Sequence, residues 1–546
     1  MKHKNIIQTG GLFLVTGFIL ITLSWYYTYP IYISSIDEVT FSQFFALLWP
    51  GLLFSLIGIF LIGYYSSRKI IQATCCCLCP ILLYITTFFF SYISSSDCGN
   101  ARSIFLVFQK VGINSHIISY FEFPHYFVLN EILHQTCGVN EKGVALISFI
   151  LYGILLALFL YLIFSKLMGQ KYNQLSFLLV IIYFIGMFSF LNYQWAPQTL
   201  ALVYFFLLIF VSIYLLSEPL TIVWKCLTIL IFLSLTLTHS FIPLVFLLFF
   251  GILTIKKRYL LQLLLFMISI YLFITIYFTM IHLEMYIETF RQSIQGFGGD
   301  YTAFVSKSFR EPEDAMSQII SNINRIRIPL VWIIALCGTV LLFLKRKIEF
   351  FLIALSIAGG AYLTVGIFYS ILGLRTFQIL FIPMTIGFTF FIFKWKKLTL
   401  FVILVILILA VFGPMRMAYN ETQFQTDEEA NACNFLANNI TVAGVPRIAV
   451  NQVDYGYFKN VYIFLRNNTS PIIIRPGEKG FFNIFNRSMN YREYVIYNPN
   501  LGKEILNIGM TKGQLFILLR DLMFNNKIYD CGKTYIVNGI LPKTKH

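Results

Sequence analysis

Long apolar runs recur from residue 6 to about residue 414, and they constrain the fold of this chain more than any other feature. A helix needs about 20 apolar residues to cross a hydrocarbon core about 30 Å thick. We predict about thirteen spans, at 6–29, 43–65, 70–93, 144–165, 175–193, 198–216, 220–238, 241–255, 259–281, 329–344, 350–371, 377–393 and 398–414. The predicted fold of residues 1–414 is an all-α polytopic membrane domain.

Composition and charge agree with that class. The 546 residues are 58% hydrophobic and only 12% charged, and the net charge of +16 is better explained by loops at a membrane than by nucleic acid. Basic residues cluster at alternate connections, namely Lys2 and Lys4, Arg68 and Lys69, Lys166 and Lys171, Lys225, 256–258, 345–347, and 394–397. Short loops rich in Lys and Arg stay inside, so we predict a cell-membrane protein with a cytoplasmic N-terminus.

With an odd number of spans, residues 415–546 lie outside the cytoplasm, and there the composition becomes globular. Short β-type runs occur at 447–451, in PIIIR, in EYVIYN and in the closing KIYDCGKTYIVNG. Capping-box patterns from Thr426 to Glu429 and from Thr511 to Gln514 predict helices. We therefore expect a small α/β extracytoplasmic domain.

Two exterior loops, 94–143 and 282–328, carry candidate functional side chains. Ionisable groups at the edge of a membrane domain indicate a site because they are costly there unless they line a wet cavity. The first loop holds Asp97, His116, Glu122, His125, Glu131, His134 and Glu141. The second holds Arg291, Lys307, Arg310, Arg325 and Arg327 beside GFGGDY, a pattern that fits a flap closing over an anionic lipid. A solvated or interfacial segment is the alternative.

Arg375 is the only basic residue in a short exterior connection. A guanidinium there suits a pair of phosphate oxygens at the lipid boundary, and snorkelling to headgroups is the alternative. Glu131 and His134 have the spacing of half a metal motif, which a solvated helix face explains equally well. The run CCCLC at 75–79 favours buried packing residues, with acylation as a minor alternative.

Other exterior features are covalent. We predict disulfides between Cys98 and Cys137 and between Cys433 and Cys531, because oxidising compartments favour them. Glycosylation sequons occur at Asn420, Asn439, Asn467, Asn468 and Asn486, although such patterns also arise by chance.

The succession Asp97, FQKVGIN, YFEFPHYFVLNEILHQTCGV, WAPQTLALVYF, LTHSFIP and LRTFQILFIP resembles the GT-C superfamily of membrane glycosyltransferases over most of the chain. The resemblance implies transfer of a sugar from a polyprenyl-phosphate carrier to a glycan or protein acceptor outside the cytoplasm. It implies Asp97 as catalytic base, Glu122 and His125 as further catalytic candidates, and Asp37 or Glu38 as the fallback for the base. Substrate-binding candidates are Arg375, Arg310, His239 and Gln198.

Oligosaccharyltransferase catalytic subunits have a similar layout, with a WWDYG motif in the exterior tail. Here the tail reads Gln452, Val453, Asp454, Tyr455 and Gly456, which keeps DYG but lacks both tryptophans. A strand-to-helix turn explains Asp454 and Gly456 equally well. This branch therefore ranks second.

Other functional classes remain open at this point. A transporter or flippase of lipid-linked sugars would be equally polytopic, but such proteins place ionisable groups or broken helices near the midplane. Here the charges collect at the exterior edge, which favours an enzyme. A membrane-anchored scaffold predicts no activity that depends on Asp97 or Arg375. Basic side chains near the leaving phosphate would make a divalent metal optional, and no cofactor is certain.

Overall fold

The computed structural model describes residues 2–32, 38–90, 101–102, 104–106, 108–109, 124–169, 173–187, 196–217, 221–279, 315–344, 349–368, 377–394, 402–412, 433, 435 and five strands after residue 446. The chain divides into two compact units. One comprises 1–86, 147–193 and 197–419, and the other comprises 87–146, 194–196 and 420–546.

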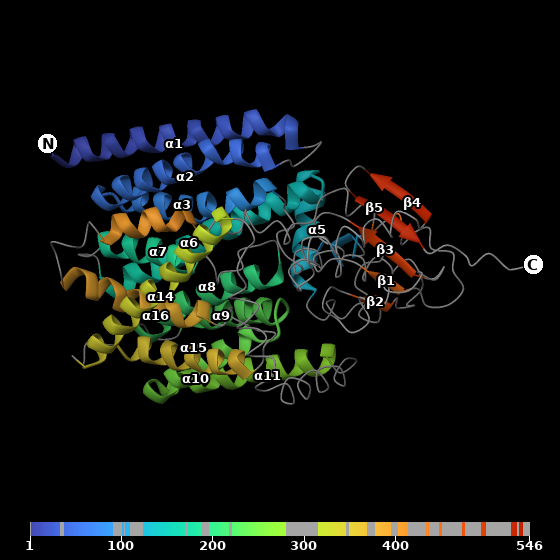
Figure 1. The fold of residues 1–546 in the computed structure, drawn as a ribbon. Coiled ribbons are helices and arrows are strands. Elements are labelled where there is room, and N and C mark those ends of the chain that lie inside the picture. Colours follow the sequence, from blue (N-terminus) through green and yellow to red (C-terminus); the bar gives the residue numbers. More distant parts are fainter. Residues whose placement is uncertain are drawn as a thin grey trace, which may run out of the picture. The chain divides into compact units, whose positions relative to one another are not determined.

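The first unit is all-helical in its described part, and its helices run roughly side by side (Figure 1). Its helices are α1 (Lys2–Tyr32), α2 (Glu38–Tyr65), α3 (Lys69–Phe90), α6 (Glu141–Met168), α7 (Asn173–Met187), α8 (Pro197–Ser217), α9 (Ile222–Thr236), α10 (Ile242–Lys256), α11 (Leu261–Thr279), α14 (Ala315–Leu344), α15 (Phe350–Phe368) and α16 (Phe377–Lys394). A 3-10 turn, η3 (Arg258–Leu260), joins α10 to α11. The last residues of α3, from Thr87 on, and the first turns of α6 belong to the second unit.

These helices coincide with the apolar runs of the sequence. In the described part of the chain, five helices are long and apolar enough to cross a membrane: Lys4–Tyr26, Ala46–Tyr65, Gly143–Met168, Pro197–Leu216 and Arg258–Tyr277. Eight shorter apolar helices lie within one residue of the bounds of the remaining predicted spans, the last of them at Val402–Phe412. The prediction of an apolar helical domain is therefore confirmed. Apolar runs form helices because a helix satisfies its backbone hydrogen bonds within one segment.

Glycines let α1 and α2 pack backbone to backbone. A Cβ placed on Gly17 would lie 2.6 Å from the carbonyl oxygen of Gly51, and one placed on Gly58 would lie 2.7 Å from that of Gly10. The glycines are seven residues apart on each helix, so they share one face and permit close approach of the two backbones. The opposite face of α1 is exposed, with Leu12 at 69%.

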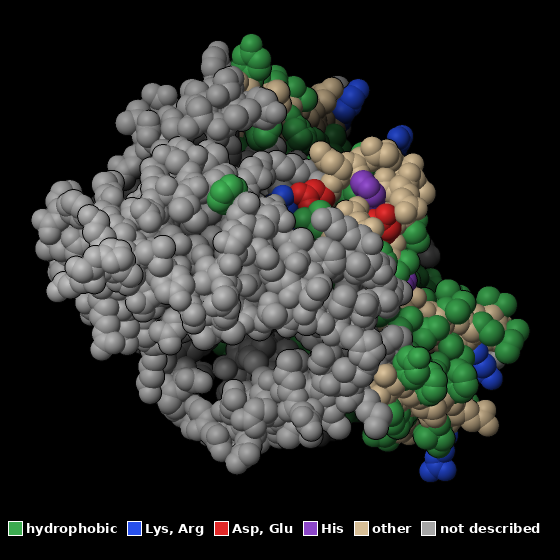
Figure 2. All heavy atoms as spheres, turned by 90° about the vertical axis from the view of Figure 1, so that its right-hand side faces the viewer, with side chains coloured by type: hydrophobic (Ala, Val, Ile, Leu, Met, Phe, Trp, Pro, Cys, Tyr) green, Lys and Arg blue, Asp and Glu red, His purple; other side chains and the backbone are tan. Residues whose placement is uncertain are grey.

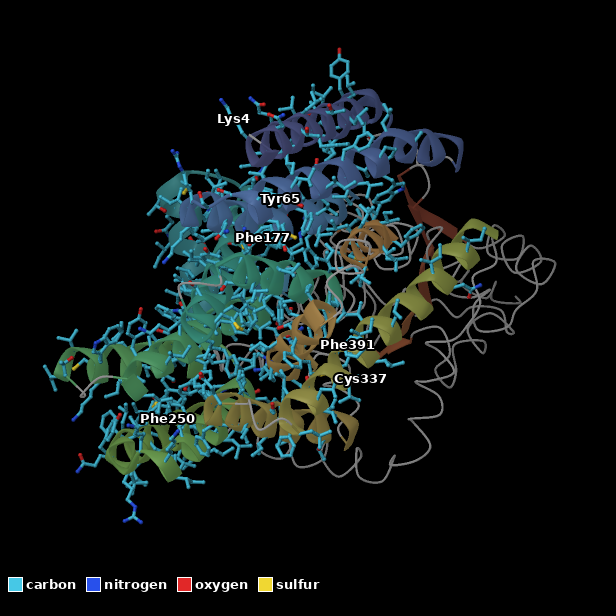
Figure 3. The ribbon with its side chains drawn as sticks, turned by 90° about the vertical axis from the view of Figure 1, so that its left-hand side faces the viewer. Lys4, Tyr65, Phe177, Phe250, Cys337 and Phe391 are labelled. Carbon is cyan, nitrogen blue, oxygen red and sulfur yellow. The ribbon has the colours of Figure 1, made fainter. Side chains whose placement is uncertain are left out.

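Similar close packing joins other neighbours. Gly63 near the end of α2 faces the ring of Phe177 on α7, and Gly338 of α14 lies against Gly387 of α16. Figure 3 shows Phe177 close to Tyr65, and Phe391 close to Cys337, in these two places.

Of the helices that extend beyond their predicted bounds, α14 does so by the most residues. α14 begins at Ala315, inside the segment 282–328 that we expected to be an exterior loop. The residues before the apolar part, AMSQIISNINRIRI, contain no glycine or proline, so nothing in them stops a helix from starting early. Arg325 and Arg327 therefore lie on a helix. Arg291, Lys307 and Arg310 lie outside the described residues.

The second unit contains α5 (His125–Cys137) and a five-stranded sheet in the order β2-β1-β3-β5-β4. The strands are β1 (Arg447–Ala449), β2 (Ile472–Ile474), β3 (Glu493–Tyr497), β4 (Asn526–Cys531) and β5 (Thr534–Asn538). β1 pairs in parallel with β2 and β3, with Ile448 opposite Ile473 and Tyr494. β5 is antiparallel to both β3 and β4.

The first three strands and β5 lie within the runs that predicted them, β4 begins one residue before its run, and β4 and β5 form the closing hairpin. The parallel pairing of β1 with β2 and β3 requires crossover connections. The helices predicted from Thr426 and Thr511 come before β1 and after β3, and they lie outside the described residues apart from the helical positions 433 and 435.

Candidate functional site

The polar segment 94–143, which lies between α3 and the apolar part of α6, contains α5, a helix with well-defined ends. It follows Pro124, whose fixed φ suits a helix start, and it stops at Gly138, which has a φ of 63°. The amide of Gly138 donates to the carbonyl of His134 over 3.0 Å. Tyr126, Phe127 and Asn130 form the buried face, which leaves Glu131 and Gln135 on the more open side.

An ion pair connects two distant parts of this segment. Arg102 Nη2 lies 2.6 Å from Glu141 Oε1, and their side chains are only 10% and 18% exposed. Glu141 stands in the first turn of α6, where Asn140 caps the helix by accepting a hydrogen bond from the amide of Gly143 over 2.9 Å. A carboxylate at a helix N-terminus is favoured by the helix dipole, so the helix start stabilises the ionised form of Glu141.

Glu131 is held by two amide groups. Gln109 Nε2 donates to one carboxylate oxygen over 3.1 Å, and Gln135 Nε2 donates to the other over 2.9 Å. Gln135 is one turn further along α5, whereas Gln109 comes from the helical stretch before it. Glu131 thus links that stretch to α5 and keeps one orientation.

His134 has a defined tautomer. Its Nδ1 lies 2.5 Å from the carbonyl oxygen of Val139, and because a carbonyl only accepts, Nδ1 carries the hydrogen. In the neutral ring the lone pair is then on Nε2. The edge of Phe105 meets the ring at a centroid distance of 6.4 Å, which fixes the imidazole further.

His125, a predicted catalytic residue, is the first residue of α5. Burial lowers the pKa of its imidazole, because desolvation disfavours the charged form. The neutral ring is therefore favoured near pH 7, the form that accepts a proton. The face of the molecule drawn in Figure 2 shows acidic side chains close to basic and histidine side chains.

Several predicted site residues lie outside the described part of the chain. These are Asp97, Glu122, Arg310, Arg375 and the fallback Asp37, together with the sequon asparagines 420, 439, 467, 468 and 486. Glu38 begins α2. The roles assigned to these residues stay predictions.

His239 and Gln198 belong to the helical unit. His239 Nδ1 accepts hydrogen bonds from the amides of Phe241 and Ile242, at 3.1 and 3.4 Å, and so caps the start of α10. Gln198 is 7% exposed in the first turn of α8. The structure gives His239 a local structural role. The roles of His239 and Gln198 as substrate ligands stay predictions.

The structure gives no support to either predicted disulfide. Cys137, at the end of α5, is an exposed free thiol, with Thr136 Oγ1 3.9 Å from its sulfur. Cys433 is buried, and Cys98 and the side chain of Cys531 lie outside the described residues. A disulfide requires Cα atoms about 4.4–6.8 Å apart with converging Cβ vectors, and the position of cysteines at the ends of a loop or domain does not ensure this geometry.

The described carboxylates of the polar segment are committed to protein partners. Glu131 accepts from two glutamines and Glu141 pairs with Arg102. Within the described ranges, no three His, Cys, Asp or Glu side chains are close enough to hold a metal ion. Glu131 and His134 therefore do not form a metal site with their described neighbours. The cysteines of CCCLC are largely buried, as the packing interpretation predicts, and Cys77 Sγ lies 3.6 Å from the carbonyl of Ile154.

Sequence reasoning missed Arg102 and Gln109. A signal for Arg102 existed, since it is a basic residue in an exterior segment, the same property that drew attention to Arg375. Its partner Glu141 is 39 residues away, so the pairing had no local signature.

Comparison with models of known protein families finds no match, and a search of curated proteins finds no similar sequence.

Proposed function

We propose that this chain is an integral membrane glycosyltransferase that moves a sugar from a polyprenyl-phosphate carrier to a glycan or protein acceptor on the extracytoplasmic face. The observation that carries the proposal is where the charges lie. Glu141, paired with Arg102, stands immediately before the apolar stretch 143–168 of α6. The polar segment thus adjoins the end of an apolar helix, where a carrier phosphate would meet a soluble acceptor.

The same pattern favours an enzyme over a coupled transporter. In the described apolar stretches, every Asp, Glu, Lys and Arg lies near an end, such as Lys166 in α6 and Lys225 in α9. In α14, Arg325 and Arg327 precede the apolar stretch Leu330–Leu344. Transporters of charged substrates place such groups near the bilayer midplane.

The proposal includes the arrangement in the membrane. Thirteen spans place the N-terminus in the cytoplasm and residues 415–546 outside as an α/β domain. The alternation of basic clusters along the sequence supports this orientation.

In the proposed chemistry, Asp97 takes the proton from an acceptor hydroxyl as that oxygen attacks the anomeric carbon, and the bond to the carrier phosphate breaks. Arg375 and Arg310 hold the departing phosphate, because a guanidinium matches two of its oxygens. Glu122 and His125 are further acid–base candidates, while Gln198 and His239 are candidates for binding the sugar.

The test compares membranes that carry wild type, Asp97→Asn, Arg375→Lys or the control Glu349→Gln. Each receives a radiolabelled polyprenyl-phosphate sugar and a crude acceptor pool. Asp97→Asn retains an oxygen that can cap a helix but cannot accept a proton, so transfer should fall about a hundredfold. Arg375→Lys should weaken use of the donor at normal protein levels, because the bidentate fork is lost. The control should match wild type, since Glu349 is an exposed residue that precedes α15.

Wild-type turnover by Asp97→Asn would overturn the assignment of the base. Lipid-linked sugar crossing sealed vesicles without any transfer would point instead to a flippase. Transfer to a sequon peptide would place the chain with oligosaccharyltransferases.

A further inference from the structure

One end of the helical unit carries a layer of basic and aromatic side chains from six different elements. This basic–aromatic layer consists of the contacting residues Lys166, Tyr214, Trp224, Lys256, Lys257, Tyr259 and Phe350, together with Lys225, which follows Trp224 in α9. Its members come from the ends of α6, α8 and α10, from η3, and from the starts of α9 and α15.

The centre of the layer is a stacked trio. Lys166 Nζ lies 4.5 Å from the ring centroid of Tyr214. Trp224 stacks on the same tyrosine, with the ring centroids 5.4 Å apart and an interplanar angle of 11°. Phe210 meets the same tyrosine edge-on at 5.1 Å. The cation–π contact holds the ammonium group of Lys166 beside the aromatic pair.

The neighbouring turn is tied to this trio. The Tyr259 hydroxyl donates to the carbonyl of Leu215, the residue after Tyr214, over 2.6 Å. Lys257 Nζ lies 5.9 Å from the Tyr259 ring, and Lys256 Nζ lies 5.6 Å from that of Phe350. These contacts hold three ammonium groups against rings that the helix ends position.

The charge of the layer is not balanced by the carboxylates that the structure describes. Among the described residues, ion pairing is limited to Arg102 and Glu141. No described carboxylate oxygen therefore lies within 4.0 Å of the ammonium nitrogens of these lysines. Residue Glu218, between α8 and α9, lies outside the described residues.

Apolar side chains flank the charges. Ile222 is 72% exposed, Val223 69% and Ile255 76%, all within three residues of a lysine of the layer. Exposed apolar side chains beside ammonium groups and amphipathic rings are typical of the boundary between hydrocarbon and headgroups. A soluble polyanion would gain nothing from these apolar groups.

We propose that the basic–aromatic layer binds the phosphate of an anionic phospholipid headgroup, with Lys166 and Lys225 as its principal ligands and Tyr214 and Trp224 at the level of the glycerol backbone. This site is separate from the proposed transferase site, because it lies at the opposite ends of α6 and α10 from the exterior connections. The two proposals can therefore fail independently.

The experiment uses the full chain purified in an uncharged detergent. Native mass spectrometry measures its binding of phosphatidylglycerol and of phosphatidylcholine, for wild type, for Lys166→Gln, for Lys166→Gln with Lys225→Gln, and for the control Lys4→Gln. Lys4 is an exposed lysine at the start of α1 that has no described place in the layer. A second measurement compares quenching of tryptophan fluorescence by brominated phosphatidylglycerol in wild type and in Trp224→Phe.

Phosphatidylglycerol should bind more tightly than phosphatidylcholine, and each lysine removed should weaken it about fivefold. Lys4→Gln should change the affinity less than twofold. Quenching should be smaller in Trp224→Phe, and soluble glycerol 1-phosphate should not compete. Equal binding of the two lipids, an unchanged affinity in the double variant, or full competition by glycerol 1-phosphate would each overturn the proposal.

Discussion

Tyr161 of α6 donates a hydrogen bond to Gln72 of α3 over 2.9 Å, and Gln72 passes the connection on to the carbonyl of Ser66 over 2.9 Å. Gln72 is 1% exposed and Tyr161 is 3% exposed. The two side chains fix the α2–α3 connection against α6.

Removing the hydroxyl of Tyr161 should therefore destabilise the helical unit. Tyr161→Phe leaves the buried oxygen of Gln72 without its donor, which costs about 1–3 kcal/mol. Thermal unfolding in detergent measures the loss, and Tyr26→Phe is the matched control because Tyr26 is 73% exposed. A melting temperature equal to that of Tyr26→Phe would show that the bond contributes nothing.

The glycine contact between α1 and α2 predicts a difference between two neighbouring positions. Gly17→Val places a side chain into the backbone of α2 and should destabilise the pair by about 1–3 kcal/mol or separate the helices. Gly11→Val is the control, since a Cβ there meets nothing within 4 Å. Crosslinking of cysteine pairs across the two helices reports their contact. Equal crosslinking in both variants would contradict the packing described.

The pair of Arg102 and Glu141 should behave as a buried ion pair. Arg102→Met alone, or Glu141→Leu alone, removes the ion-pair partner of a largely buried charge and should cost about 3 kcal/mol. The double variant should recover most of that loss, because both charges are then absent. Unfolding monitored by protease resistance of the polar segment completes the double-mutant cycle. Additive losses would mean that the two groups do not interact.

His125 should make stability dependent on pH. Its pKa in the folded protein is lowered by burial, so the folded state binds fewer protons than the unfolded state, whose imidazole has a pKa of about 6.5. Its contribution should be full above about pH 6.5 and should decline as the pH falls through the folded pKa. The melting temperature of wild type between pH 7.5 and 5 should thus fall more than that of His125→Phe. Parallel curves for the two proteins would assign the pH dependence to other groups.

The proposed orientation can be tested by labelling. Single cysteines replacing Arg346 and Asn500 in a cysteine-free variant should react oppositely with an impermeant maleimide on intact cells. Position 500 should be labelled and position 346 protected until the membrane is permeabilised. Labelling of both positions on intact cells would remove the model with an odd number of spans.

The apolar helices and the strands followed from the sequence because their signals are local. The run at 143–168 is long enough to satisfy its own backbone hydrogen bonds in hydrocarbon, and EYVIY is rich in the β-branched and aromatic residues that strands favour. The start of α14 was placed too late because the apolar signal begins only after its first turns.

The sequence by itself thus determined which stretches are apolar helices and strands, and that charges stay at the ends of the apolar stretches. Only the tertiary structure decided which side chains meet: Arg102 with Glu141, Gln109 with Glu131, and Lys166 with Tyr214 and Trp224. It also placed residues 87–146 in one unit with the C-terminal sheet. The physical reason is that secondary structure depends on hydrophobic patterns over a few turns, whereas contacts between residues far apart in the chain depend on how the helices pack, which no local pattern encodes.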